Sequence, residues 1–430
     1  MHKRISVGEL MRRGEAALQT GPFGTQLKAD EYVDEGVPVI NVRNVGFGDV
    51  RDDDLEFVTE AKAEQLHHHR LLPDDIVFGR KGAVERHGLI SEAQRGWVQG
   101  SDCLRLRLKS ERVDVRYLSY YLRTRAHGDW MHALCSFGAT MASLNQDIVA
   151  RITFPAPAIE VQRKIAAILS AYDDLIANNQ RRIVLLEGMA EEIYREWFVR
   201  MRFPGAAVVE VENGIPSGWS LVPTIEAFKY HGGATPAKDV PRYWNEGSVH
   251  WYTPTDITGA EGMFIEASSE RCTEEGLESC SATLFPAYTV MMTSRATIGA
   301  MGINLEPACT NQGFIACVPN ERYPLPFLYH WLKLAKPHFE LLSGGSTFPE
   351  LTKGTFKRIK VLTPPSSLMQ RFDATVKPLF AQIETLIRAN RRLKETRDAL
   401  LPRLISGKLK VDHLDIRLPP SMRAEAEAVA

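Results

Sequence analysis

The sequence lacks the marks of a membrane-inserted or exported protein. No apolar run approaches the roughly 18 residues that a membrane-spanning helix needs. Residues 1–14 contain no apolar core of the kind found in signal peptides, so we expect a cytoplasmic protein that meets no membrane. The six cysteines form no CxxC pair, which in the cytoplasm favours reduced thiols over disulfides or a zinc site.

The chain is also poor in catalytic motifs. It has no phosphate loop of the GxxxxGK[ST] or GxGxxG form, no GxSxG, no HExxH, and no Asn-Pro-Pro or Asp-Pro-Pro run such as amino-methyltransferases use. His67-His68-His69 invites a metal interpretation, but consecutive residues do not share one face of a helix or strand. These absences favour recognition over reaction, and we expect no catalytic residue, no metal and no cofactor.

Positive charge is not in excess. The net charge is −1, whereas modules that bind duplex DNA usually carry a visible basic excess. The charge is uneven, however, because residues 351–360 contain four basic residues and no acidic one. A subunit of a larger complex can also leave part of the phosphate contact to its partners. The net charge therefore does not exclude a DNA-binding role.

What the chain does contain is an internal repeat, whose second copy follows the first by about 207 residues. The first copy comprises residues 136–140, Arg151-Ile152, Pro155 and Pro157, and the second comprises residues 343–347, Arg358-Ile359 and Pro364-Pro365. Each copy runs into a long amphipathic helix. At 430 residues the chain holds several domains. The repeat predicts two similar domains and two similar helices with pseudo-two-fold symmetry, which suits a two-fold target such as duplex DNA.

Both halves mix short strands with turns and one clear helix, which predicts an α+β fold. The expected strands are residues 37–42, 76–78, 104–108, 249–253, 288–292 and 314–318, and the expected helices are residues 117–125 and 327–334. Three dipeptide pairs match across the halves, namely Gly24-Thr25 with Ala234-Thr235, Asn44-Val45 with Asp256-Ile257, and Tyr117-Leu118 with Phe327-Leu328.

The two long helices carry a coiled-coil pattern, with mostly apolar residues in alternating steps of four and three. The seams are Ile165, Leu169, Tyr172, Ile176, Asn179, Ile183, Leu186, Ala190, Ile193 and Trp197, and Phe372, Val376, Leu379, Ile383, Leu386, Asn390, Leu393, Arg397, Leu400 and Leu404. Antiparallel pairing sets Asn179 against Asn390 and fixes the register, whereas parallel pairing leaves both amides facing apolar residues. The alternative is two helices packed separately on their own domains. Pro378 should kink the second helix or mark its true start.

With these features the chain resembles the specificity subunits of type I restriction–modification systems. The matching segments are residues 21–28 and 38–44 in the first half, residues 251–257, 310–314 and 345–347 in the second, and the proline-rich entry to each helix with residues 160–162 in the first copy. Each segment alone is a weak motif, but their duplicated order is specific. Two departures are Leu368-Met369-Gln370, which lacks the acid at Glu160, and Pro378.

The resemblance implies two target recognition domains that each read half of a bipartite DNA site, spaced by an antiparallel coiled coil. It also implies two methyltransferase subunits docked on the chain, joined by restriction (endonuclease and translocase) subunits, with no chemistry and no S-adenosylmethionine in the chain itself. The corresponding boundaries are residues 1–157 for the first recognition domain, 158–200 for the central helix, 205–363 for the second domain, 364–410 for the distal helix, and 411–430 for a disordered tail.

Base edges and phosphates are contacted by basic, amide and hydroxyl side chains, and such residues at the ends of strands are the best candidates. We expect DNA contacts from Thr25, Lys28, Arg43, Asn44, Arg80, Lys81 and Arg86 in the first domain, and from Thr235, Lys238, Ser294, Arg295, Asn311 and Gln312 in the second. The turns at residues 136–138 and 343–345 could offer backbone N–H groups to phosphate. For any one of them the alternative is an ordinary polar surface residue.

Two other functions stay open on the residues alone. An enzyme with an undetected site would act when the purified chain is given a metal ion or a methyl donor. A coiled-coil scaffold with no nucleic-acid role would retain no DNA by sequence, even with its partner subunits present.

If two separate domains read the DNA, changing one should affect one half-site. Arg80→Ala should weaken binding or relax the choice of sequence in one half-site, and Arg295→Ala in the other, because each removes a cation from one domain only. Binding to duplexes altered in one half-site at a time measures this. Loss of specificity in both half-sites together would contradict the model of two readers.

Overall fold

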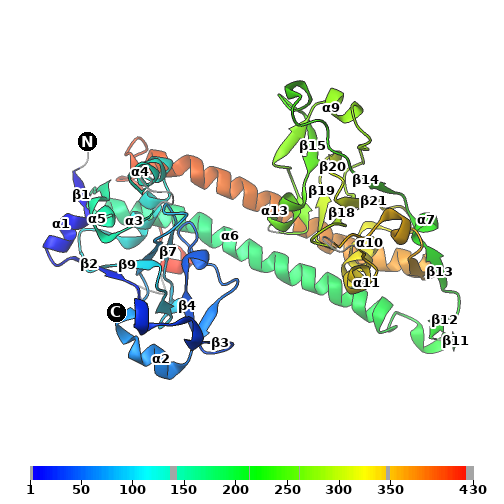
Figure 1. Ribbon diagram of the computed structural model, residues 1–430, viewed down its shortest axis with the longest axis horizontal. Helices are drawn as coiled ribbons and strands as arrows, with labels where there is room; N and C mark the ends of the chain where they lie inside the picture. Colours follow the sequence, from blue (N-terminus) through cyan, green and yellow to red (C-terminus); the bar gives the residue numbers. More distant parts are fainter. Residues whose placement is uncertain (1–2, 136–142, 213, 261, 345–348, 423–430) are drawn as a thin grey trace. The chain divides into compact units, whose positions relative to one another are not determined.

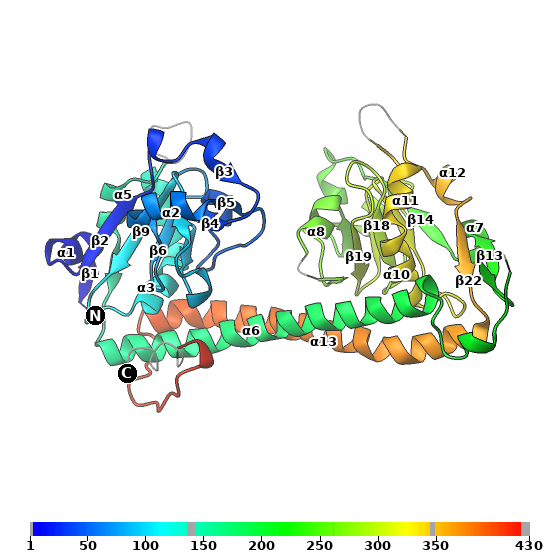
Figure 2. The ribbon, with the colours of Figure 1, turned by 90° about the horizontal axis from the view of Figure 1, so that it is seen from below.

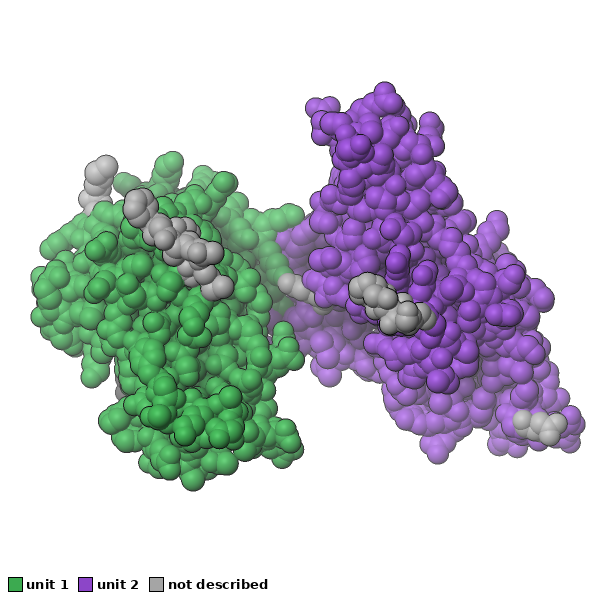
Figure 3. Space-filling view, viewed as in Figure 1, with its two compact units in different colours: residues 1–176, 393–430 green, residues 177–392 purple. Residues whose placement is uncertain are grey.

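The computed structural model describes residues 3–135, 143–212, 214–260, 262–344 and 349–422. The chain forms two compact units, drawn in Figures 1 and 3. Unit 1 comprises residues 1–176 and 393–430, and unit 2 comprises residues 177–392. Helix α6 (Ile159–Tyr194), extended by a π-helical turn (Arg195–Val199), begins in unit 1 and ends in unit 2. Helix α13 (Ser366–Ile405) begins in unit 2 and ends in unit 1.

Unit 1 has an antiparallel sheet of order β2-β9-β6-β7 and a mixed sheet of order β3-β5-β4-β8, while β1 pairs with β10. The strands are β1 (Arg4–Ser6), β2 (Ala16–Thr20), β3 (Tyr32–Val33), β4 (Val37–Ile40), β5 (Glu56–Val58), β6 (Ile76–Gly79), β7 (His87–Leu89), β8 (Val98–Gln99), β9 (Cys103–Leu108) and β10 (Thr153–Pro155). The shorter helices are α1 (Val7–Arg12), α2 (Glu60–Gln65), α3 (Val115–Leu122), α4 (Arg125–Cys135) and α5 (Gln146–Arg151).

Unit 2 has a five-stranded sheet of order β14-β21-β18-β19-β16 and a three-stranded sheet of order β17-β15-β20, with the pairs β13-β22 and β11-β12 beside them. The strands are β11 (Val211–Glu212), β12 (Ile215–Pro216), β13 (Ser220–Pro223), β14 (Tyr230–Gly232), β15 (Val249–Tyr252), β16 (Phe264–Ile265), β17 (Glu270–Cys272), β18 (Val290–Thr293), β19 (Met301–Asn304), β20 (Ala308–Thr310), β21 (Phe314–Cys317) and β22 (Lys360–Thr363). The shorter helices are α7 (Thr224–Ala227), α8 (Pro254–Thr258), α9 (Glu274–Glu278), α10 (Leu325–Leu334), α11 (Lys336–Leu341) and α12 (Lys353–Phe356). The α+β prediction is confirmed.

The two units repeat one hydrogen-bonding scheme. The β6–β7 hairpin corresponds to β18–β19, and the backbone N–H that follows β6, on Arg80, donates to Asp102 O at 2.8 Å. In unit 2 the equivalent bond, from Ser294 N to Gly313 O, is also 2.8 Å. This register pairs β9 with β21 and α3 with α10, which carry the predicted pairs Tyr117-Leu118 and Phe327-Leu328, all four buried.

Two glycines at equivalent positions of the two units meet the same steric constraint. Gly21 follows β2 and Gly233 follows β14. A Cβ on Gly21 would overlap the carbonyl oxygen of Gly100, and a Cβ on Gly233 would overlap that of Asn311. The same close backbone approach therefore excludes a side chain in both units. The register set by these glycines places Gly24-Thr25 two residues away from Ala234-Thr235, so that predicted pairing is wrong.

In each unit one helix lies between the main sheet and the long helices, α3 in unit 1 and α10 in unit 2 (Figure 2). Helix α3 starts where the Asp114 carboxylate accepts a hydrogen bond from Tyr117 N (3.0 Å), and α10 starts after Pro324. In unit 2, α10 adds Phe327 to a cluster with Phe198 and Phe372, whose ring centroids are 4.8 to 6.5 Å apart. The long helices therefore supply part of each domain's core.

The helices run antiparallel within unit 2. The ring of Tyr194 contacts that of Phe372, while Asn179 Nδ2 donates to Asn390 Oδ1 at 2.9 Å. Residues later in α6 therefore contact residues earlier in α13, which is the order of an antiparallel pair. The structure contains the predicted amide contact, and its role in setting the register stays a prediction. Helix α13 begins at Ser366 and continues through Pro378, so that proline does not mark the start of the helix. Phe372, Val376 and Phe380 bury the face around it and offset its missing hydrogen bond.

The start of the C-terminal tail differs from the disorder that its sequence leads one to expect. Val411 and Met422 are buried in the core of unit 1. Ser421 N donates to Asp174 Oδ2 (3.0 Å), and Arg116 donates to the Ser421 carbonyl oxygen (3.1 Å). Two apolar anchors and these backbone contacts hold residues 411–422 against unit 1.

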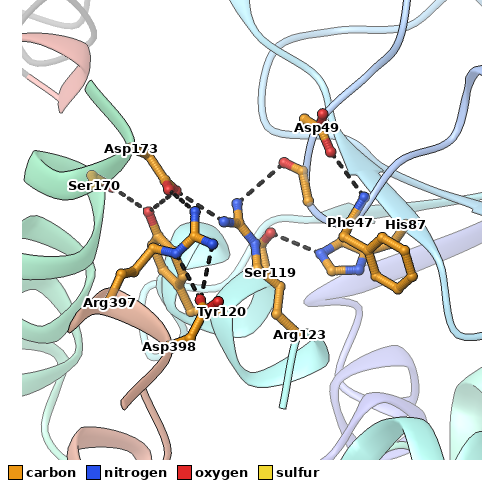
Figure 4. Close-up of polar contacts among 11 residues, drawn as sticks. Phe47, Asp49, His87, Ser119, Tyr120, Arg123, Ser170, Asp173, Arg397 and Asp398 are labelled. Carbon is orange, nitrogen blue, oxygen red and sulfur yellow. Dashed lines mark hydrogen bonds and ion pairs between the residues drawn. The ribbon is translucent and has the colours of Figure 1, made fainter. Parts of the chain in front are cut away.

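Asp173 on α6 joins the domain of unit 1 to both long helices (Figure 4). Its Oδ2 accepts hydrogen bonds from Tyr120 (2.7 Å) and Arg123 (2.9 Å) at the end of α3, and its Oδ1 accepts one from Arg397 of α13 (2.6 Å). Arg123 also donates to the carbonyl oxygen of Gly48, in the loop before β5 (3.3 Å). Burial would raise the pKa of Asp173, but the two arginines and the tyrosine outweigh it and lower the pKa.

We expect the Asn179–Asn390 contact to be worth about 0.5–1.5 kcal/mol, the usual net value of a hydrogen bond. Asn179→Ala should lower the free energy of unfolding by that much relative to Asn178→Ala, because the neighbouring Asn178 is exposed and the change in helix propensity is the same. Denaturant unfolding measures the difference. Equal stability of the two variants would show that the amide pair does not hold the helices.

Asp173→Asn should destabilise unit 1 by about 1–3 kcal/mol, because it removes the charge between two arginines at a site that is only partly solvated. The depressed pKa means that this contribution is complete above the ordinary carboxyl pKa of about 4 and is lost as the pH falls through the lower folded value. Urea unfolding at pH 7 and below pH 4 should show the gap between wild type and variant closing in acid. Asp129→Asn, in an exposed pair, is the control. A gap that is independent of pH would refute the assignment.

Candidate nucleic-acid interface

The loop of the β6–β7 hairpin carries three of the predicted contacts, Arg80, Lys81 and Arg86. Gly82 in this loop has φ of 76°, and its counterpart Ala296 in the β18–β19 loop has φ of 62°. The carbonyl oxygen of Arg80 accepts Leu144 N, as that of Ser294 accepts Leu351 N, both at 2.8 Å. Arg80 therefore corresponds to Ser294, and Lys81 corresponds to Arg295.

Two of these arginines lie on aromatic rings. The guanidinium carbon of Arg80 is 5.2 Å from the ring centroid of Phe23, and that of Arg86 is 5.4 Å from the centroid of Phe47. Lys81 instead forms an exposed ion pair with Asp102 (3.1 Å). A guanidinium held over an aromatic face is attracted to the ring and loses part of its freedom to move.

The other first-domain candidates lie on neighbouring loops. Lys28 is exposed, and Arg43 is half-exposed and pairs with Glu56 (3.0 Å). Thr25 is exposed and lines a pocket of about 280 Å³. The other residues around this pocket are Gln26, Lys62, Gln65, Leu66, His68 and His69. These residues offer hydroxyl, amide and basic groups to a polar ligand.

Two candidates have buried side chains. Asn44 is fully buried; its Oδ1 accepts Asn41 N (3.0 Å), and its Nδ2 donates to the Asp53 carbonyl oxygen (2.9 Å). Its counterpart Asp256 accepts Thr253 N (2.7 Å), so the predicted pair is a matched structural cap. Ser294 is also buried, at the end of β18. Both residues lie just after a strand, Asn44 after β4 and Ser294 after β18, and the fold turns their side chains inward.

The second domain groups its candidates differently. Lys238 Nζ lies 3.6 Å from the ring centroid of Trp244 and 4.3 Å from that of Trp251, and it pairs with Glu270 (2.7 Å). This lysine is held by two indoles and one carboxylate. Its charge is therefore partly neutralised where it lies.

Thr235 and Gln312 lie together, since the threonine hydroxyl donates to Gln312 Oε1 at 2.8 Å. Asn311 Oδ1 accepts Gly313 N (2.9 Å) and shapes the turn before β21. Arg295 is exposed. Unit 2 thus combines amide and hydroxyl groups with the cations Lys238 and Arg295, whereas unit 1 has two arginines over phenylalanines.

Sequence reasoning missed the two phenylalanines, whose side chains are 54% (Phe23) and 48% (Phe47) exposed. A signal was present, because Pro22-Phe23-Gly24 and Gly46-Phe47-Gly48 both place a large apolar side chain in a turn. The predicted phosphate turns at residues 136–138 and at Gly345 lie outside the described residues, as do Ser346 and Thr347.

A metal interpretation gains no support. His67-His68-His69 forms a short 3₁₀ helix, in which His67 Nδ1 lies 3.1 Å from the Glu64 carbonyl oxygen. Within the described ranges, no group of three or more His, Cys, Asp or Glu side chains is arranged to hold a metal ion. Over the same part of the chain, no helix is both long enough and apolar enough to cross a membrane.

Comparison with known proteins gives one consistent result. The family model for the type I restriction modification DNA specificity domain matches twice, over residues 24–187 and 216–394. The MjaIX specificity subunit of Methanocaldococcus jannaschii is 34% identical over 168 residues, which are 39% of this chain and 38% of that protein. The HindI specificity subunit of Haemophilus influenzae is 24% identical over 337 residues, covering 64% of this chain and 72% of that protein.

The fold has a solved counterpart. The S subunit of a type I restriction–modification system from M. genitalium superimposes with a TM-score of 0.57 at 17% identity, covering 94% of this chain and 96% of the other. The two family matches together span most of the chain and coincide with the internal repeat. The chain therefore belongs to the family of type I restriction–modification specificity subunits.

Proposed function

We propose that this chain is the DNA-reading subunit of a type I restriction–modification complex. Each recognition domain reads one half of a bipartite duplex site, and the long helices set the spacing between the half-sites. Two methyltransferase subunits dock on the chain, and restriction subunits join them. The chain itself performs no chemistry, binds no S-adenosylmethionine, and works in the cytoplasm.

One observation carries this proposal: the two units share a scaffold but differ in the side chains at equivalent loop positions. The hairpin loop has Arg80 and Lys81 in unit 1, where unit 2 has Ser294 and Arg295. The loop after β2 holds Phe23 under an arginine, whereas the loop after β14 holds a lysine between two tryptophans. Backbone positions that are kept while their side chains change are expected of two readers with different sequences to recognise.

The decisive experiment is sequencing of modified bases in the host genome with and without this gene. We expect a split methylated motif that disappears on deletion, because the methyltransferase loses its means of choosing sites. Restoring the gene on a plasmid is the control.

Unchanged methylation would contradict the proposal unless the system is silent, and co-purification of a methyltransferase subunit with the chain decides between these cases. Methyl transfer or DNA cleavage by the purified chain, given only a methyl donor or a metal ion, would instead show that it is an enzyme.

A further inference from the structure

Arg80 and Arg86 of unit 1 carry positive charges that form no ion pair with an acid in the described part of the chain. Some exposed arginines of the unit have carboxylate partners, such as Arg95 with Glu92 (2.7 Å) and Arg43 with Glu56 (3.0 Å). Among the described residues, no hydrogen bond or ion pair reaches the side chain of Arg80 or Arg86. The Nε of each is enclosed without an acceptor. The Nη groups of the two arginines are not enclosed in this way, and they are the donors that a ligand with acceptor atoms would bond.

Each of these guanidinium groups is stacked on a phenylalanine that is about half exposed, Arg80 on Phe23 and Arg86 on Phe47. An exposed phenylalanine adds nothing to the core of the domain. Under an arginine it restricts the plane of the guanidinium and lowers the side-chain entropy lost on binding. The two pairs are therefore preorganised forks of N–H donors.

The Arg86–Phe47 pair lies on two loops that are hydrogen-bonded to each other and to neighbouring helices. Both arginines belong to the β6–β7 loop, and the Phe47 loop is bonded to β7 through Gly48 N to His87 O (2.7 Å) and His87 N to Gly46 O (3.1 Å). Gly48 is bonded in turn to Arg123, which reaches Asp173 on α6 (Figure 4). His87 shares a buried hydrogen bond with Ser119 of α3 (2.9 Å). The loop is thus braced against α3 and α6.

A planar fork in a fixed orientation matches the two acceptors, O6 and N7, that guanine presents in the major groove. A phosphate also accepts bidentate hydrogen bonds from a guanidinium, but such a contact selects no base, so a change in the chosen sequence distinguishes a base contact from a phosphate contact. We infer that Arg80 on Phe23 and Arg86 on Phe47 each read a guanine, both in the half-site of unit 1. The inference rests on the proposed function and adds the base that these residues select.

Unit 2 has no such pair at the equivalent positions. The counterpart of Arg80 is the buried Ser294, and the pairing of Phe78 with His87 and of Met292 with Met301 makes Ala300 the counterpart of Arg86. The guanines assigned to these two arginines therefore belong to one half of the motif only.

The test uses the methylated motif of the host genome with wild-type or variant full-length chains in the intact complex. Arg80→Lys and Arg86→Lys keep the charge but remove the fork. Each should relax one G·C position in the same half-site, reducing discrimination there about tenfold or more, and should leave the other half-site unchanged. Arg95→Lys, at an exposed arginine with its own acid, is the matched control and should leave the motif as it is.

Variants of the two phenylalanines distinguish a role in choosing the base from a role in folding. Phe23→Leu should relax the same position as Arg80→Lys, and Phe47→Leu the same position as Arg86→Lys, by about two- to fivefold, because the apolar bulk remains and only the aromatic face is lost. A merely structural role would lower methylation at all sites without changing which base is chosen. The melting temperature of each variant chain shows whether it folds.

Several results would overturn the inference. One is a wild-type motif that lacks two G·C pairs in one half-site. For the lysine variants, an unchanged motif in both or relaxed base choice in both half-sites would also contradict it. So would complete loss of methylation by lysine variants that melt like wild type. A wild-type chain that confers no motif at all would contradict the proposed function itself, and the inference would fall with it.

Discussion

The packing of one short helix in each unit, α3 or α10, between a sheet and the long helices is the constraint on which the rest of the structure depends. Each domain uses apolar surface of α6 and α13 to complete its core. Deleting a long helix would therefore expose the interior of a domain. Each domain and the helix segments that complete its core fold together.

The two units meet this constraint with different chemistry. In unit 2 the contact is largely aromatic, with His330 and Tyr329 of α10 against Phe380 and Tyr194 of the long helices. An ion pair between Lys333 of α10 and Glu191 of α6 (2.8 Å) adds to it. In unit 1 the equivalent end of α3 uses Tyr120 and Arg123 around the carboxylate of Asp173. Apolar packing tolerates small shifts, whereas a charge held by three donors demands one geometry. Unit 1, which has the carboxylate with three donors, also carries the two stacked arginines.

The sequence predicted the scaffold well because periodic burial leaves a periodic pattern. The heptad steps located both long helices, and the single asparagine in each seam identified the contact seen between Asn179 and Asn390. The strand expectations at residues 37–42, 104–108 and 314–318 fall within two residues of β4, β9 and β21. The prediction that Pro378 marks the start of the second helix is wrong, because the buried face around it sustains a helix that the local residue disfavours.

By itself, then, the sequence determined the duplication, the helix pair and the family, since these depend on spacing along the chain. Only the tertiary structure decided which polar residues face solvent. Asn44 and Ser294 look like binding residues but cap or end strands in the interior, whereas Phe23 and Phe47 look like core residues but support arginines at the surface. The physical reason is that exposure depends on what packs against a side chain from distant parts of the chain, and one-dimensional spacing does not carry that information.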